Sequence, residues 1–232
     1  MNKKPSQNHR NRQWHNWLVY DLNDKYLLDC AELYRGTLYD LGCGESPYQH
    51  FFLQFAKQYV GVDWEGSRHV TKETILADLN QPLSIQSEVA DTVVSLSVME
   101  HLYQPQMMLD EACRILKPTG NIILQVPWQW WIHEAPHDYF RYTPYALNFM
   151  LEKAGFNNIK IKAQGGFFTM WILKFTYFTA RFIRGPKVLR KLIKLCFSPL
   201  WYLGQRLAPL VDKLDKNWQK ETIGFVVTAN KS

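Results

Sequence analysis

The chain has 232 residues, of which 47% are hydrophobic and 21% charged. This composition excludes a disordered or fibrous protein and predicts one domain with a full core, carrying at most an appendage. The formal net charge is +6, but no acidic residue occurs in 153–211, where eleven Lys and Arg lie. The rest of the chain has 16 basic and 21 acidic residues. The sequence therefore predicts an acidic body with a basic, apolar C-terminal segment that has a different role.

The N-terminus and the cysteines indicate the compartment. Residues 1–14 are polar and basic, with no apolar core of a signal peptide, and we expect a loose tail. The four cysteines form no CxxC pair and suggest neither a zinc site nor a disulfide framework. We therefore expect reduced thiols in a cytoplasmic protein, and no metal.

The first half of the chain alternates predicted helices and strands. Apolar spacing predicts a helix over 14–35 that ends at Gly36. Ser46 as N-cap and Pro47 in the first turn predict a helix over 46–58. Apolar runs predict four strands, at 37–41, 59–63, 73–79 and 90–97.

The second half continues the alternation. A helix is predicted over 105–118, stopped by Pro118 and Gly120, and Thr143 is expected to cap a helix over 144–155. Further strands are predicted at 121–126, 158–163 and 223–229. Such alternation implies βαβ units and a mainly parallel sheet, whose ligands bind at the carboxyl ends of the strands.

The sequence DLGCGESP places two glycines, Gly42 and Gly44, between a strand and a helix, which is typical of a loop that touches a cofactor. A dinucleotide loop would need a glycine at Pro47, and the carboxylates of Asp40 and Glu45 would repel a pyrophosphate. A cofactor with a positive centre and no phosphate, such as S-adenosylmethionine, avoids both objections. Asp40 can then pair with the amino end of that cofactor.

The next two strand ends carry further carboxylates. Asp63 follows Gly44 by 19 residues, which suits a bond to a ribose diol, and Trp64 beside it can cover an adenine ring. Asp78 can accept from the adenine amino group, and Leu79 can pack on the ring.

In these segments the sequence resembles the class I S-adenosylmethionine-dependent methyltransferases, in the branch called type 11. The matching stretches are YDLGCGES, YVGVDW, ADL, ADTVVSLSVMEHL, LDEACRILKPTGNIILQVP and HDYFRYTPYALNFMLEKAGF. The resemblance covers about residues 36–163 and the last strand. It implies an α/β fold with a Rossmann-like, doubly wound, seven-stranded sheet whose last strand is antiparallel. It also implies S-adenosylmethionine contacts at Asp40, Gly42, Gly44, Asp63, Asp78 and Leu79, with Ser97 and His101 on the cofactor or acceptor side.

The loop WQWWIHEAPHDYFRYTP after the fifth strand is rich in polar and aromatic groups, which indicates an acceptor pocket or lid. His133 or His137 can serve as a general base, oriented by Asp138 or Glu134. The alternative is that Asp138 and Arg141 form only a structural ion pair. No helix presents these groups on one face, as a metal-binding HExxH would. We assign acceptor contacts to His101, Trp128, Tyr139 and Arg141.

About sixty residues separate the last two strands, where the resembled family needs a short loop. Residues 166–183 are apolar but are interrupted by Lys174 and Arg181, which argues against a membrane span. Residues 186–197 predict a helix with an apolar side and one basic stripe, Lys187, Arg190, Lys191 and Lys194, which is typical of an interfacial membrane anchor. The alternatives are that these helices pack on the body, or that the basic patch holds RNA.

Together these features predict three parts: a tail and helix over 1–35, a methyltransferase domain over 36–163 plus 222–232, and a helical insertion over 164–221. The predicted function is S-adenosylmethionine-dependent methyl transfer to a small, lipid-linked or glycan-related acceptor. The predicted location is the cytoplasm, peripheral on the inner membrane face, where residues 166–206 contact an anionic surface. Competing hypotheses are a non-enzymatic membrane-associated protein with this fold, and an RNA methyltransferase.

Overall fold

The computed structural model describes residues 4–65 and 74–232. Seven strands form one sheet in the order β3-β2-β1-β4-β5-β7-β6. Strands β1 to β5 pair in parallel, and β7 lies antiparallel to both β5 and β6, which confirms the predicted fold class. The strands are β1 Thr37–Leu41, β2 Gln58–Asp63, β3 Ile75–Leu76, β4 Ala90–Leu96, β5 Leu116–Pro127, β6 Phe156–Ala163 and β7 Gly224–Lys231.

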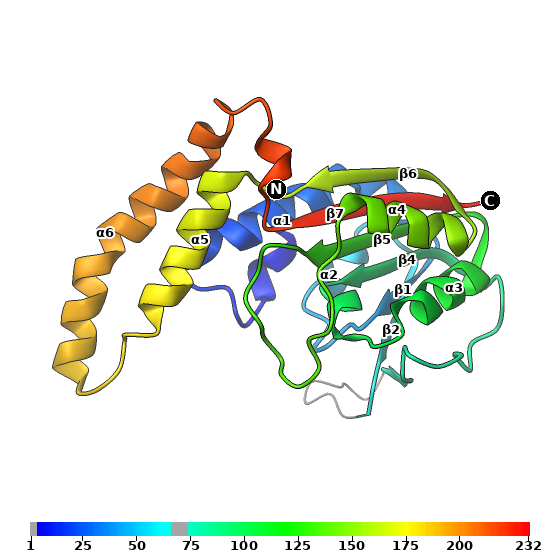
Figure 1. Cartoon of the computed structure of the whole chain (residues 1–232). Coiled ribbons are helices and arrows are strands. Elements are labelled where there is room, and N and C mark those ends of the chain that lie inside the picture. Colours follow the sequence, from blue (N-terminus) through cyan, green and yellow to red (C-terminus); the bar gives the residue numbers. More distant parts are fainter. Residues whose placement is uncertain (1–3, 66–73) are drawn as a thin grey trace.

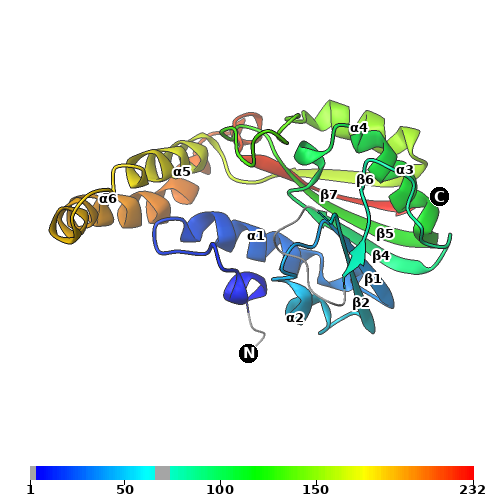
Figure 2. The same cartoon turned by 90° about the horizontal axis from the view of Figure 1, so that it is seen from below.

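Helices cover both faces of the sheet, as Figure 2 shows, with α3 and α4 on one face and α1 and α2 on the other. The helices are α1 Trp17–Asp29, α2 Gln49–Phe52, α3 Pro105–Ile115, α4 Pro144–Lys153, α5 Phe167–Ala180 and α6 Lys187–Asp212. Short 3-10 turns occur at Pro5–Asn8, Ala31–Leu33, Met99–His101 and Trp218–Lys220.

The apolar periodicity of these helices explains the layers. Leu109 of α3 and Leu147 of α4 are fully buried against one face of the sheet, and Phe51 and Phe52 of α2 against the other. Each large apolar side chain buried in this way contributes about 2 kcal/mol. The strands thus hold their carboxyl ends at one rim of the sheet, and the sequence motifs lie there.

Several predicted boundaries were wrong in the first half of the chain. The helix predicted over 46–58 shrinks to α2, and Ser46 is not its N-cap because Ser46 has a φ of +52°, outside the helical region. The helix predicted over 14–35 ends at Asp29. In the strand predicted over 73–79, pairing is limited to Ile75 and Leu76, and residue 73 lies outside the described residues.

The predicted helix over 105–118 ends three residues early. Leu116 pairs with Ala90 of β4, and this pairing starts β5 before Pro118 and Gly120, the residues expected to act only as a helix stop. The cap at Thr143 is confirmed, because its side chain accepts from the backbone N–H of Ala146 at 3.3 Å.

The N-terminal segment, expected to be a loose tail, packs on α1 from residue 4 onward. Ser6 is fully buried, and its N–H and hydroxyl donate to Asp24 at 2.7 and 2.8 Å. Arg12 also donates to Asp24, at 3.0 Å. The prediction failed because these contacts join residues 12–18 positions apart and leave no periodic signal.

Helices α5 and α6 form a hairpin that projects from one end of the sheet (Figure 1). At its base, both carboxylate oxygens of Asp212 accept from the backbone N–H groups that open α5, from Gly166 and Phe168 at 2.8 Å and from Thr169 at 3.3 Å. Free N–H groups at a helix start are favourable partners for a negative charge. The Asp212 carboxylate therefore fixes the two helices to each other.

The distal part of the hairpin packs on little else. The helix predicted over 186–197 is longer in the structure, because α6 continues through Pro199 and Pro209 to Asp212. Proline usually interrupts a helix, and here the buried Trp201 just beyond Pro199 holds the continuing helix against α5. Large apolar side chains remain exposed on the distal part: Phe178, Phe182, Val188, Leu189, Leu192, Leu195 and Leu200. Across residues 4–65 and 74–232, the helices all fall short of the length and apolar content that a membrane crossing needs.

Candidate active site

Three cavities follow the rim formed by the carboxyl ends of β1, β2, β4 and β5. The β2 cavity, of about 330 Å³, is lined among others by Asp63, Trp64, Asp78, Leu79 and Tyr139. The glycine-loop cavity, of about 220 Å³, lies over Asp40, Gly42 and Gly44. The β5 cavity, of about 270 Å³, lies beside β5, and its lining includes Gln125, Trp130 and His133.

Shared walls join the three cavities. Gly42 lines both the β2 and glycine-loop cavities, Ser97 lines the β2 and β5 cavities, and Leu96 lines the glycine-loop and β5 cavities. The three cavities therefore adjoin one another along the rim, and we refer to them together as the trough.

The glycine loop needs both of its glycines. Gly42 has a φ of +82°, and a Cβ there would lie 2.4 Å from the side chain of Val98. Gly44 has a φ of +54°, and a Cβ there would have no heavy atom within 4 Å. Any other residue is strained at both positions, and the space beside Gly44 leaves room for a ligand against the main chain.

Asp63 ties this loop to the end of β2. One carboxylate oxygen accepts from the N–H of Gly44 at 2.7 Å, and the other from the N–H of Trp64 at 2.8 Å. Asp63 is nearly buried yet lines the β2 cavity. Asp78, on the same cavity, accepts from the backbone and side-chain N–H groups of Asn80 at 2.9 and 2.8 Å, which shapes the turn after β3.

Asp40 is buried at the end of β1 and accepts a hydrogen bond of 2.7 Å from the hydroxyl of Tyr59. Burial raises the pKa of Asp40 to about 7, against the opposing effect of the Tyr59 bond, and the nearby charge of Asp63 raises it further. The ionised form of Asp40 is therefore costly near neutral pH, and a cation in the glycine-loop cavity would favour it.

The loop after β5 is held by an ion pair. Arg141 donates two hydrogen bonds to Asp138, at 2.6 and 2.8 Å, and a third to the carbonyl oxygen of Trp131 at 2.9 Å. The hydrogen bonds from Arg141 lower the pKa of Asp138 to about 2. This is the structural arrangement that the sequence left open as an alternative, and it engages most of the Arg141 guanidinium within its own loop.

The two histidines of this loop line different cavities. His133 lines the β5 cavity, whereas His137 lines the β2 cavity, where its ring meets Trp64 edge to face at 5.6 Å between centroids. His101 and Tyr139 also line the β2 cavity. Trp128, by contrast, is half-buried and packs against Phe225 on the core.

Sequence reasoning missed most of the β5 cavity. Three amides, Asn23, Gln125 and Gln164, hydrogen-bond one another at 3.0–3.3 Å. The walls that the sequence did not indicate are His9, Asn11, Tyr20, Tyr48, Glu100 and Tyr177. They come from distant segments and are brought together only by tertiary packing. The sequence fragment MEHL, which contains Glu100, was the one feature that could have indicated one of these lining residues.

Comparison with known proteins agrees with this geometry. Residues 39–124 match the family model described as a methyltransferase domain. A probable S-adenosylmethionine-dependent methyltransferase of Mycolicibacterium smegmatis is 26% identical over 94 residues, which is 38% of this chain and 37% of that protein. The chain thus covers only about a third of the length of the curated relatives it matches.

Among solved structures, a S-adenosylmethionine-dependent methyltransferase from Archaeoglobus fulgidus has a TM-score of 0.59 at 14% identity, covering 92% of this chain and 94% of that one. The [4+2]-cyclase SpnF has a TM-score of 0.61 at 17% identity, covering 93% and 82%. At these low sequence identities, the similarity shows the fold alone.

The strand order, the glycine loop and the carboxylates at successive strand ends define a nucleoside-binding α/β domain. With the family match over residues 39–124, they make the α/β body similar to the class I S-adenosylmethionine-dependent methyltransferase domains. The sequence predicted reduced cysteines. In the structure none of the four is in a disulfide, since Cys30, Cys43, Cys113 and Cys196 are all free.

Proposed function

We propose that this protein transfers a methyl group from S-adenosylmethionine to an acceptor held in the β5 cavity. The observation that carries the proposal is that the cavities of the trough adjoin one another. Ser97 lines both the β2 and β5 cavities, and Leu96 lines both the glycine-loop and β5 cavities. When bound, S-adenosylmethionine supplies an electrophilic methyl group on its sulfonium. The residues present fit this cofactor, because the space beside Gly44 is open and Asp40 is a buried carboxyl favoured by a cation.

Roles for the cofactor-binding side chains follow from the cavities that they line. In the β2 cavity Asp63 binds the ribose diol, Asp78 accepts from the adenine amino group, and Trp64 and Leu79 pack on the ring. In the glycine-loop cavity Asp40 pairs with the ammonium group. Ser97, with a φ of +57°, forms the wall between the cofactor and the acceptor.

His133 is the stronger of the two base candidates, because it lines the β5 cavity while His137 faces the β2 cavity. Asp138 lies 3.5 Å from Nδ1 of His133 and is placed to orient it. His101 and Tyr139 line the β2 cavity beside the proposed cofactor, whereas Trp128 and Arg141 support the loop. Alignment in a cavity shielded from water supplies much of the rate of methyl transfer.

A lipid-linked or glycan-related acceptor at the inner membrane face is favoured by the hairpin. Its distal part combines exposed apolar side chains with the basic stripe, Lys187, Arg190, Lys191 and Lys194, which matches an anionic lipid surface. Tyr177 of α5 lines the β5 cavity. The acceptor cavity therefore adjoins the element that we assign to the membrane, and the three amides suit the hydroxyl groups of a glycan.

Two other functions compete. The fold alone does not require methyl transfer, since the structural neighbour SpnF is a [4+2]-cyclase, and a non-enzymatic membrane-bound protein could keep the same scaffold. An RNA methyltransferase would use the basic stripe for phosphates, but the exposed apolar side chains beside it favour lipid.

Purified protein should transfer labelled methyl from S-adenosylmethionine to a component of the membrane fraction of cell extracts, and not of the soluble fraction. The Asp63→Ala variant serves as the negative control for cofactor-dependent labelling. Labelling of RNA that high salt abolishes would instead support the RNA hypothesis. Cofactor binding without labelling of any fraction would contradict the enzymatic proposal.

Cofactor affinity should depend on pH through Asp40. Pairing with the cofactor's ammonium group should lower the pKa of Asp40 from about 7, so the complex binds fewer protons than the free protein. Affinity is then highest above pH 7 and falls as the pH drops, roughly tenfold between pH 8 and pH 6.

Calorimetry of S-adenosylmethionine binding at pH 6 and pH 8 checks this, with Asp40→Asn as the matched control. Tyr59, Asp63, Cys43 and Tyr48 are the other titratable groups around Asp40. A wild-type profile as flat as that of Asp40→Asn would contradict the role of Asp40.

A further inference from the structure

Glu100 is a fully buried acid at the turn after β4, and it lines the β5 cavity. Neither carboxylate oxygen has a hydrogen-bond partner among the described residues. Arg141 lies close enough to act on its charge. The terminal nitrogens of that guanidinium are engaged by Asp138 and Trp131, and its buried Nε has no hydrogen-bond partner among the described residues. A buried carboxylate without a partner is costly, so its retention points to a ligand.

Two imidazoles stand beside this carboxylate. Nε2 of His101 is 3.7 Å from Oε1 of Glu100, and the rings of His101 and His133 are 4.9 Å apart between centroids. One donor atom from each of the three residues lies within 4.8 Å of the donor atoms of the other two. A single ion placed between them would need only small side-chain shifts.

Backbone carbonyl groups set the tautomers of both histidines. Nδ1 of His101 is 2.6 Å from the carbonyl oxygen of His137, and Nδ1 of His133 is 3.2 Å from that of Trp131. A carbonyl oxygen only accepts, so in neutral imidazoles both Nδ1 atoms carry the proton and both Nε2 atoms keep a lone pair. Histidines that ligate metals are oriented in this way.

We propose that Glu100, His101 and His133 bind one divalent metal ion, with the remaining coordination positions open to the β5 cavity. Two imidazoles and one carboxylate form a donor set that Zn²⁺ accepts in catalytic sites with an open position. From the sequence we expected no metal. Spacing could not reveal this set, because 32 positions separate His101 from His133 and no helix carries all three residues.

The next step rests on the proposed methyl transfer. A metal ion at this site favours an acceptor molecule that presents a hydroxyl oxygen. A metal ion lowers the pKa of such a hydroxyl and makes a separate base unnecessary, so His133 then acts as a ligand. The oxygen–carbon bond forms while the sulfur–carbon bond breaks with its electron pair on sulfur. The hydroxyl proton leaves to water.

The test uses full-length protein stripped with chelator and titrated with ZnCl₂ in a calorimeter, with metal analysis after dialysis. We expect one ion per chain, and roughly a hundredfold weaker binding for Glu100→Gln and for His133→Asn. The matched control is Glu152→Gln, which neutralises an exposed carboxylate on α4 away from the three cavities and should bind as the wild type does. Co²⁺ gives a second readout, because its visible absorption reports the coordination number.

Equal binding by the wild type and both variants, or none by any of them, overturns the site and leaves Glu100 as a partner of Arg141 alone. Thermal unfolding of each variant with and without Zn²⁺ separates lost ligation from lost folding, since a folded variant without a zinc-induced shift has lost only the site. S-adenosylmethionine binding is measured in parallel. Zinc binding without methyl transfer contradicts the proposed function only, and methyl transfer without stoichiometric metal contradicts the metal site only.

Discussion

Replacing Asp63 by Ala is expected to weaken S-adenosylmethionine binding by more than tenfold. In addition to its proposed bond to the ribose, Asp63 accepts the N–H groups of Gly44 and Trp64. Hydrogen bonds to a charged group contribute about 1.5–3 kcal/mol each, and about 1.4 kcal/mol corresponds to a tenfold change in affinity. The substitution removes the carboxylate that we propose binds the ribose. It also releases the glycine loop that shapes the cofactor site.

Calorimetry with S-adenosylmethionine measures this effect, and two variants separate its causes. Glu65→Ala removes an exposed carboxylate two residues away and should leave the affinity unchanged. Asp63→Asn keeps an accepting oxygen and should fall between the wild type and Asp63→Ala. Wild-type affinity in Asp63→Ala would refute the assignment of the β2 cavity to adenosine.

Neutralising the basic stripe should release the protein from anionic vesicles. Each Lys or Arg near such a surface contributes about 1 kcal/mol. The fourfold variant K187Q/R190Q/K191Q/K194Q should therefore partition roughly a thousandfold more weakly. Flotation with vesicles that contain anionic lipid, at two salt concentrations, measures the change.

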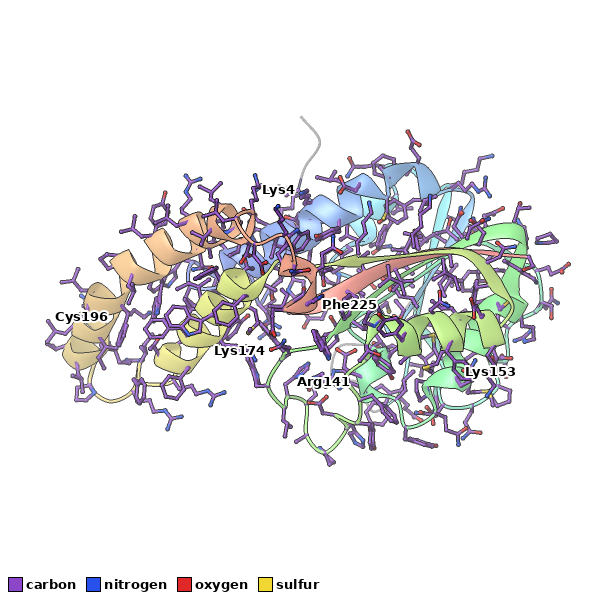
Figure 3. The ribbon with its side chains drawn as sticks, turned by 45° about the horizontal axis from the view of Figure 1, so that its top comes forward. Lys4, Arg141, Lys153, Lys174, Cys196 and Phe225 are labelled. Atoms are coloured by element: carbon purple, nitrogen blue, oxygen red, sulfur yellow. The ribbon has the colours of Figure 1, made fainter. Side chains whose placement is uncertain are left out.

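The matched control neutralises four exposed lysines of the body, Lys25, Lys57, Lys153 and Lys160, and keeps the total charge change equal. Figure 3 shows Lys153 at the end of the molecule opposite Cys196 of the hairpin. Vesicle binding should then stay close to the wild type. If the two fourfold variants lost binding equally, net charge and not the hairpin would account for the attraction.

The fold could be predicted from the sequence wherever a local pattern had a single physical meaning. The apolar run 121–126 marked β5, and the paired Gly42 and Gly44 marked a loop that only glycine tolerates. Boundaries failed where a tertiary contact outweighed a local signal, as when pairing with Ala90 carried β5 through Pro118.

The candidate site likewise has one part that could be predicted from the sequence and one part that could not. Its proposed cofactor side follows strand ends along the chain, so spacing and the family resemblance could point to Asp40 and Asp63. Its acceptor side is assembled from distant segments, for example by the hydrogen bond between Asn16 and Tyr177, 161 positions apart. No pattern of spacing encodes such a contact, and the packed N-terminal segment was therefore missed.

The direction of β7 has a practical consequence for handling the protein. Because β7 runs antiparallel to β5, it ends at the amino ends of the parallel strands, on the edge of the sheet opposite the trough. His9 and Asn11, by contrast, line both the glycine-loop and β5 cavities. A label attached at the end of β7 is therefore remote from the candidate site (Figure 1), whereas one attached near His9 lies at its wall.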